Sequence, residues 1–259
     1  MRKTILFFLS VILLLSVTSL ILSVCLSISK AFSESSCKNE ILKEIYKKGY
    51  IRNEFLDTVE PIHLFQDENG VIYYKNYILH YPNDIKNLSF EIPENITVVA
   101  AGCFSHNEYL ESITLGSNVL FIDHAAFEFC TKLKTVSFSS KLLYIGSLAF
   151  SNCYSLKSVQ LPDTVRFIGT QAFAESGIED NFKIPKEIEF IGDEAFAKTS
   201  ITSFKIQSNF QFYVGEWLIT KDNLESSFIL YVPTNYIFNN TTERLMLYSC
   251  GTDTQIVYE

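Results

Sequence analysis

The sequence predicts a repeat solenoid, made mainly of short β-strands with short helical turns, because one unit returns at a fixed spacing. The pair Ala126-Phe127 returns at Ala149-Phe150, Ala172-Phe173 and Ala195-Phe196, and Cys103-Phe104 fills the same place one step earlier. Each step is 23 residues. Two further observations agree with this period. Apolar residues recur at fixed offsets from each Phe, and Gly146, Gly169 and Gly192 share one position.

The apolar offsets indicate two extended stretches in each unit. The first lies nine and eleven residues after the Phe, at Ile113 and Leu115, Val136 and Phe138, Val159 and Leu161, and Phe182 and Ile184. Alternate residues of a strand point to the same side, so this spacing predicts a strand with one buried face. The second stretch is expected near Ile122 and Ile145, with one tight helical turn at Ala-Phe. One unit cannot bury its apolar side alone, so stacked turns should form a parallel sheet.

The repeat predicts the domain boundaries. We expect five clear turns and a degraded sixth over residues 67–218, a spacer and N-terminal cap over 31–66, and a C-terminal cap over 219–259. Ile201, Phe204 and Ile206 come one residue early. We expect that shift to persist, so that the sixth turn falls 22 residues on, with Trp217-Leu218 near the Ala-Phe position.

The residues that recur at fixed positions in each unit resemble the leucine-rich repeat of the BspA type. The unit is most complete in Tyr144-Ile-Gly-Ser-Leu-Ala-Phe-Ser-Asn-Cys-Tyr-Ser-Leu-Lys-Ser-Val-Gln-Leu-Pro162. Two flanks are also similar to that family: a hairpin from Gly70 to Pro82, and a closing segment, Leu230-Tyr-Val-Pro233. Cys103 departs from the family's Ala, and Ser176 and Thr199 depart from its Cys. The resemblance implies a parallel sheet on the concave face and adhesion or recognition at a cell surface.

The first 30 residues are predicted to direct export. Arg2-Lys3 precedes an uncharged, mostly apolar stretch from Thr4 to Ser29. This stretch is long enough to span a membrane as a signal anchor, but Ala31-Phe32-Ser33 could also serve as a signal-peptide cleavage site. In both readings the body of the protein lies outside the cell, either as a single-pass membrane protein or secreted.

Sequons and charge are consistent with export and exclude some partners. The sequence contains N-glycosylation tripeptides at Asn87, Asn95, Asn239 and Asn240. The net charge is −8, and residues 1–30 hold three of the 21 cationic residues but none of the 29 acidic ones. An acidic body argues against nucleic acid and against docking on anionic lipid.

Cysteine and histidine provide no clear catalytic or metal site. Cys130 and Cys153 share one repeat position, which predicts buried free thiols or, alternatively, a disulfide between stacked turns. The sequence has no Cys-x-x-Cys motif, and His63, His80, His106 and His124 are scattered. We therefore expect no metal, no cofactor and no enzymatic activity.

The candidate binding residues are the polar positions that flank the inward residues of the predicted strands. They are Ser112, Thr114, Thr135, Ser137, Ser158, Gln160, Lys183, Ser203 and Lys205. They would form a hydroxyl-lined surface ending in two lysines, suited to a protein or glycan ligand. The alternative is an ordinary solvated sheet face. The leading hypothesis is therefore a surface binding or adhesion protein, and the rival is a structural coat or spacer protein without a specific ligand. A hydrolase built on the C-terminal cap is a third reading, although no converging nucleophile and base is evident there.

Overall fold

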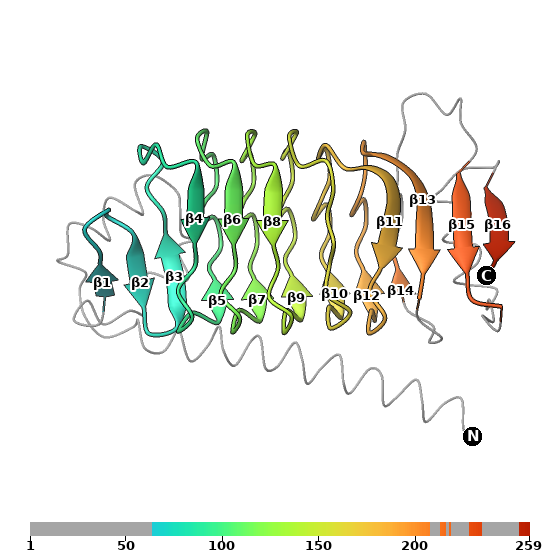
Figure 1. The fold of residues 1–259 in the computed structure, drawn as a ribbon, viewed down its shortest axis with the longest axis horizontal. Helices are drawn as coiled ribbons and strands as arrows, with labels where there is room; N and C mark the ends of the chain where they lie inside the picture. The colour runs from blue at the N-terminus through green and yellow to red at the C-terminus, as the bar shows by residue number, and fades with distance from the viewer. Residues whose placement is uncertain (1–63, 208–212, 216–217, 219–227, 235–253) are drawn as a thin grey trace, which may run out of the picture. The chain divides into compact units, whose positions relative to one another are not determined.

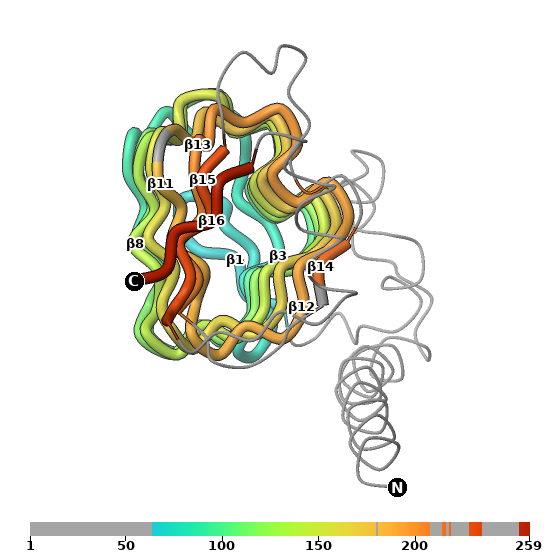
Figure 2. The backbone as a smooth tube through the Cα atoms, turned by 90° about the vertical axis from the view of Figure 1, so that its right-hand side faces the viewer, coloured from blue at the N-terminus to red at the C-terminus, as the bar shows by residue number. Residues whose placement is uncertain are grey.

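A computed structural model describes residues 64–207, 213–215, 218, 228–234 and 254–259, and these form a β-solenoid (Figure 1). The expected leader, the spacer and most of both predicted caps lie outside the described residues. Within the described residues, no helix is long and apolar enough to cross a membrane. Viewed from the end, the turns superimpose, and each passes through two opposite walls (Figure 2).

The first wall is a nine-stranded sheet that runs along the solenoid. It begins with β1 and the antiparallel hairpin β2–β3, and the strands that follow pair in parallel, one from each turn. The order is β1 (Leu64–Gln66), β2 (Ile72–Tyr74), β3 (Tyr77–His80), β5 (Val98–Val99), β7 (Phe121–Ile122), β9 (Tyr144–Ile145), β10 (Phe167–Ile168), β12 (Phe190–Ile191) and β14 (Tyr213–Val214). The expected hairpin and the second extended stretch are therefore confirmed.

The second wall holds the predicted parallel sheet, which the structure divides in two. One part is β4 (Ser89–Glu91), β6 (Ser112–Thr114) and β8 (Thr135–Ser137). The other is β11 (Glu179–Ile184), β13 (Ser200–Ile206), β15 (Ile229–Val232) and β16 (Gln255–Tyr258). Between them the fourth turn passes along the same wall without forming a strand at Ser158–Leu161. The closing segment around Leu230 is β15, which extends this sheet.

The Ala-Phe corners are not helical turns, so that expectation is wrong; the described residues contain no helix. Two residues of each corner adopt positive φ angles, such as Ala125 (54°) and Phe129 (57°) around Phe127. A helical turn needs consecutive right-handed residues, so these positions interrupt it. The corner backbone instead bonds to the next turn: the Phe127 N–H donates to the Ala149 carbonyl oxygen at 2.8 Å. The row of backbone hydrogen bonds between neighbouring turns thus continues through the corners.

A ladder of stacked phenylalanine rings fills the core. Phe104, Phe127, Phe150, Phe173 and Phe196 are fully buried, and successive ring centroids lie 4.8, 5.0, 5.3 and 5.4 Å apart. Tyr81 extends the stack at 5.0 Å from Phe104. Aromatic stacking adds to the area that each ring buries, so this column contributes strongly to the packing between turns.

The shared glycine position is explained by close backbone approach. A Cβ atom placed on Gly169 would lie 2.4 Å from the backbone nitrogen of Ser147 in the preceding turn. Real Cβ atoms do not approach backbone so closely, so a side chain at Gly169 would push the two turns apart. The repeat spacing therefore requires glycine here.

The sixth turn keeps a 23-residue register, which corrects the expected 22-residue step. Tyr213 pairs with Phe190, and Phe196 N–H donates to the Leu218 carbonyl as Phe173 N–H donates to Ala195. Leu218 thus stands in the Ala position. The one-residue shift exists only on the second wall, where Phe182 pairs with Phe204 beside an irregularity at Asp180/Asn181. A bulge adds a residue locally, which explains why the shift does not propagate.

Candidate binding surface

The predicted polar residues lie in two register rows on the outer face of the second wall, which we call the polar strip. One row contains Ser89, Ser112, Thr135, Ser158, Asn181 and Ser203; the other contains Glu91, Thr114, Ser137, Gln160, Lys183 and Lys205. Strand pairing aligns these residues except Ser158 and Gln160, which continue the rows through the fourth turn. The inward column between the rows includes Ile113 and Phe182, both 2% exposed.

Most of the predicted strip residues are exposed, but Ser203 is not. Seven of the nine are exposed, and Ser112 is partly exposed. Ser203 is only 2% exposed, which corrects its assignment as an outward position. Its register places it between Asn181 and Ile229, and its hydroxyl forms a hydrogen bond with Asn181 Oδ1.

Sequence reasoning missed Ser89, Glu91 and Asn181, which extend the strip. Ser89 and Glu91 flank Phe90, which already matched the inward column, so the same period-two rule could have identified them. Asn181 flanks the inward Phe182 and lies one 23-residue step after Ser158, so the same rule could have identified it as well.

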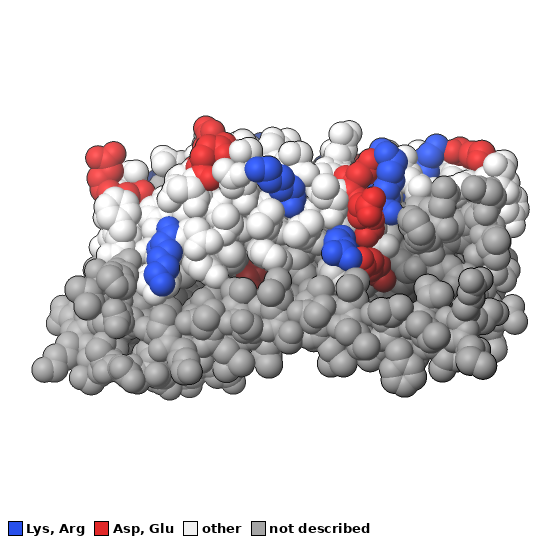
Figure 3. Space-filling view, turned by 90° about the horizontal axis from the view of Figure 1, so that it is seen from below, with Lys and Arg blue, Asp and Glu red and all other residues white. Residues whose placement is uncertain are grey.

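Charged columns outside the strip are paired from turn to turn. Lys134 binds Glu111 at 2.7 Å, Lys186 binds Asp163 at 2.6 Å, and further pairs are Lys157–Glu179 and Arg166–Glu189. Figure 3 shows cationic and acidic residues interspersed over the described part of one face. These pairs link neighbouring turns, although exposed ion pairs contribute little stability individually.

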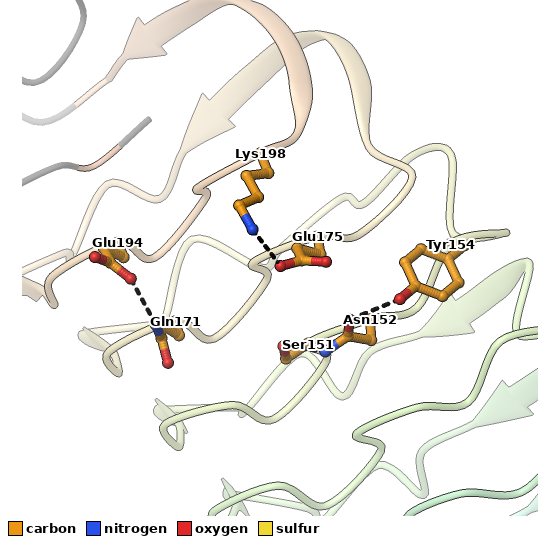
Figure 4. Close-up of polar contacts among 7 residues, drawn as sticks. All are labelled: Ser151, Asn152, Tyr154, Gln171, Glu175, Glu194 and Lys198. Carbon is orange, nitrogen blue, oxygen red and sulfur yellow. Dashed lines mark hydrogen bonds and ion pairs between the residues drawn. The ribbon is translucent and has the colours of Figure 1, made fainter. Parts of the chain in front are cut away.

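The corners also satisfy their own polar groups. Lys198 Nζ lies 2.8 Å from Glu175, and Gln171 Nε2 donates to Glu194 at 2.5 Å (Figure 4). The Tyr154 hydroxyl donates to Asn152 Oδ1 at 2.8 Å in the same region.

The strip differs from these columns because much of its polar chemistry is unpaired. Among the residues that the structure describes, seven strip side chains make no hydrogen bond or ion pair with another residue: Ser112, Thr114, Thr135, Ser137, Ser158, Gln160 and Lys183. Their donors and acceptors are therefore free to meet solvent or a ligand. The strip offers hydrogen bonds along its length and positive charge toward one end.

The cysteines at the repeat position are buried free thiols, as the first of the two sequence readings predicted. Cys130 Sγ contacts the Phe104 carbonyl oxygen at 3.1 Å, and Cys153 Sγ contacts that of Phe127 at 3.2 Å. Burial raises the pKa of Cys130 to about 12, and it also raises the pKa values of Cys103 and Cys153. The described residues contain no cluster of three His, Cys, Asp or Glu side chains able to hold a metal ion.

Two of the four sequons can be placed. Asn87 and Asn95 are exposed, as glycan acceptors must be, whereas Asn239 and Asn240 lie outside the described residues. His80 is buried, and the exposed His106 ring stacks on Phe129 with centroids 4.8 Å apart.

Comparison with known proteins identifies the repeat. Residues 97–225 match the BspA type leucine rich repeat region in six copies. A comparison with curated proteins gives no significant match. Among solved structures, the pneumococcal vaccine antigen PcpA has a TM-score of 0.63 and 22% identity, covering 78% of this chain and 49% of that one. The chain thus spans about half of the PcpA chain, and at this identity the likeness shows the fold alone.

Two further solved structures are leucine-rich-repeat proteins. The one from T. pallidum has a TM-score of 0.49 and 18% identity, covering 76% of this chain and 97% of that one. The one from Bacteroides ovatus has a TM-score of 0.43 and 20% identity, covering 75% and 68%. On the evidence of its 23-residue register and its six matched copies, this chain belongs to the BspA-type leucine-rich-repeat family.

Proposed function

We propose that the protein is a cell-surface or extracellular binding protein that recognises a protein or glycan ligand through the polar strip. The observation that carries this proposal is the contrast between surfaces. Charged columns elsewhere pair between turns, as in Glu111–Lys134, whereas most strip side chains have no partner among the described residues. A surface of unpaired donors and acceptors can form hydrogen bonds with a ligand without first breaking its own.

The repeat geometry favours an extended ligand. Each turn presents similar groups at the spacing of neighbouring strands, about 4.8 Å. Each hydrogen bond contributes only about 0.5–1.5 kcal/mol net, so useful affinity needs several turns acting together. The same regularity favours binding over catalysis, because Thr114, Ser137 and Gln160 provide hydroxyl and amide groups but no general base.

The sequence supports an external location for this role. The apolar leader and the exposed Asn87 and Asn95 fit passage through a secretory compartment, with a retained anchor or a secreted product. PcpA is a pneumococcal vaccine antigen, which is consistent with exposure of that protein to a host. Adhesion to a host or matrix component would then be the biological use of the strip.

The test is a strip variant and a matched control. We would replace Thr114, Ser137, Gln160 and Lys183 together by alanine and measure binding to arrays of matrix proteins and glycans. The control replaces four exposed residues outside the strip by alanine: Lys132, Ser140, Thr170 and Glu187. We expect the strip variant to lose at least about tenfold in affinity and the control less than about twofold.

Circular dichroism would show that both variants remain folded. If the folded strip variant binds as tightly as the wild type, the strip is not the recognition surface. If the wild type shows no saturable binding to any component, a structural spacer role is favoured instead.

A further inference from the structure

We propose that Lys183 and Lys205 form a subsite for the carboxylate of an acidic glycan. This inference rests on the proposed function, because it assigns a ligand class to one end of the same strip. We call these two residues the lysine pair.

The lysine pair departs from the charge pattern of the other turns. Lys183 on β11 and Lys205 on β13 are direct partners in the parallel register, and both are exposed. Like charges placed opposite each other in a sheet are destabilising. Elsewhere the described turn-to-turn pairs join opposite charges, as in Glu175–Lys198 and Asp163–Lys186. Glu259 and Asp163 offset part of this repulsion, yet the two lysines remain adjacent and exposed on the strip, where a ligand carboxylate could meet both.

One of the two lysines already binds a carboxylate in the structure. Lys205 Nζ forms an ion pair with Glu259 Oε2, and the two side chains are 47% and 42% exposed. Lys183 makes no direct ion pair with any described residue, but it lies near enough to Asp163, the partner of Lys186, to help lower the pKa of that carboxyl. The pair thus offers one exposed ammonium group with no direct ion-pair partner and another whose carboxylate partner is accessible to competition by a ligand.

The neighbours of the pair add groups suited to a sugar ring. Asn181 lies two residues before Lys183 on β11 and is exposed, and its Oδ1 accepts a hydrogen bond from the buried Ser203 hydroxyl of β13. On the other side Lys205 pairs with Tyr231 of β15, which is partly exposed; Figure 1 shows the three strands side by side. An amide, an ammonium group and a phenol ring together can meet the hydroxyls, the carboxylate and the apolar face of an acidic sugar.

The pairing of the strands favours a glycan over an extended peptide. Peptides that bind sheets gain most from main-chain hydrogen bonds to an open strand edge. The strand that carries Lys205, β13, is paired on both sides, with β11 and with β15, so its backbone groups are already used. The strand that carries Lys183, β11, is the first of its sheet, and the fourth turn passes along its other side (Figure 1), where Glu179 N–H donates to the Lys157 carbonyl oxygen. Recognition at this position depends on side chains, and a sugar chain bonds mainly through its own hydroxyl and carboxylate groups.

The experiment compares a charged glycan with its neutral form, using the full-length protein. The probes are an oligogalacturonide, which carries a carboxylate on each sugar, and its methyl ester, which has the same sugars without the charge. Poly-glutamate is the third probe, because it carries carboxylates on a peptide. Affinity is measured by calorimetry at low and high salt, since screening weakens exposed charge pairs.

We expect the oligogalacturonide to bind several-fold more tightly than the ester and poly-glutamate. Lys183→Gln and Lys205→Gln should each weaken its binding about three- to fivefold. Glu259→Gln should strengthen it, because Lys205 then loses its internal carboxylate. Two controls carry the same charge changes on other turns at exposed positions, Lys141→Gln and Glu108→Gln, and both should bind like the wild type.

Each contrary result is informative. Absence of oligogalacturonide binding, equal binding of the ester, or tighter binding of poly-glutamate overturns the acidic-glycan assignment. Equal effects of Lys183→Gln and Lys141→Gln would show general charge attraction instead of a subsite. The proposed function fails separately, when the folded four-residue strip variant retains wild-type binding to the ligands found on the arrays.

Discussion

The rings of Phe173 and Phe196 lie almost parallel, with an interplanar angle of 1° and centroids 5.4 Å apart. The two residues are one repeat apart in sequence, so their rings occupy the same place in successive turns. The same relationship joins Phe150 to Phe173 at 5.3 Å and 4°. The regular spacing of the turns is therefore visible in the core as well as in the sheets.

Loss of a central ring from this ladder should be costly. Phe150 is fully buried between Phe127 and Phe173. We expect Phe150→Ala to lower the free energy of unfolding by about 3–5 kcal/mol, because it removes apolar burial and leaves a cavity. Urea denaturation followed by circular dichroism measures this change. The control is Tyr154→Ala in the same turn, where the side chain is 50% exposed and the expected loss is below about 1 kcal/mol. Similar losses in both variants would contradict a central role for the ladder.

Two neighbouring alanines should respond oppositely to glycine. Ala125 has a φ of 54°, a conformation that costs a non-glycine residue about 1–2 kcal/mol, whereas Ala126 is not among the positive-φ residues. Ala125→Gly should therefore be neutral or stabilising by less than about 1 kcal/mol, after the entropy cost of glycine and the loss of a methyl group on a residue that is 8% exposed. Ala126→Gly should destabilise by about 1–2 kcal/mol, because it loses a buried methyl group as well. Thermal and urea unfolding of both variants provide the comparison, and a shift in the same direction for both would refute the explanation.

The buried thiols should make the fold less stable in alkali. Their folded pKa values are raised by burial, to about 12 for Cys130 from an ordinary value of 9.0. Above pH 9 the unfolded chain ionises these thiols while the folded chain keeps them protonated, so stability falls as pH rises toward the folded pKa. Each thiol contributes a loss of about 1.4 kcal/mol per pH unit in that window. Urea titrations between pH 7 and pH 10.5 measure the slope.

The control for the alkaline effect is Cys130→Ala. Its unfolding should release about one proton fewer in this pH range, so its unfolding free energy should fall less steeply as pH rises. Alkylation provides an independent check at pH 8. Cys103, Cys130 and Cys153 should resist a thiol reagent in the native protein and react after unfolding. Resistance after unfolding without reductant, followed by labelling once a reductant is added, would reveal a disulfide and contradict the structure.

Cysteine at position 176 should stabilise the fold relative to serine. Ser176 occupies the place of Cys130 and Cys153, is 4% exposed, and its hydroxyl has no hydrogen-bond partner among the described atoms. A buried unsatisfied hydroxyl costs about 1–3 kcal/mol, whereas a thiol behaves as a small apolar group. Ser176→Cys should therefore raise the unfolding free energy by about 1 kcal/mol. Thr199→Cys is the control: its hydroxyl donates to the Phe196 carbonyl at 2.8 Å, and so no gain is expected.

The fold could be predicted from sequence wherever the period alone determines the structure. Ile122 and Ile145 are both fully buried and pair directly, as one 23-residue step requires. The corners could not be predicted, because Ala125, Leu148 and Glu194 have no preference for positive φ. Those conformations are imposed by the inter-turn hydrogen bonds, which are formed only when the turns stack.

The candidate site was predictable to a similar extent. Period-two alternation placed Thr114 and Ser137 correctly, since strand geometry alone determines which side they face. It placed Ser203 wrongly as an exposed residue, because the alternation fails on β13, where Ser203 and Phe204 are both buried beside the irregularity in the β11–β13 pairing. The contrast between paired columns and the unpaired strip also depends on distances between turns, which sequence spacing does not contain.

The alignment of Ser112 with Thr135 and of Thr114 with Ser137 has a consequence for how such a protein can change. Inserting or deleting one whole 23-residue unit would alter the length of the strip by about 4.8 Å while leaving the pairing within every remaining turn intact. If the strip binds a ligand as proposed, the number of repeats sets how many ligand units it can span, and the residues within each turn determine which units it accepts. Reach and selectivity can thus evolve independently, the first by gain or loss of units and the second by substitution within them.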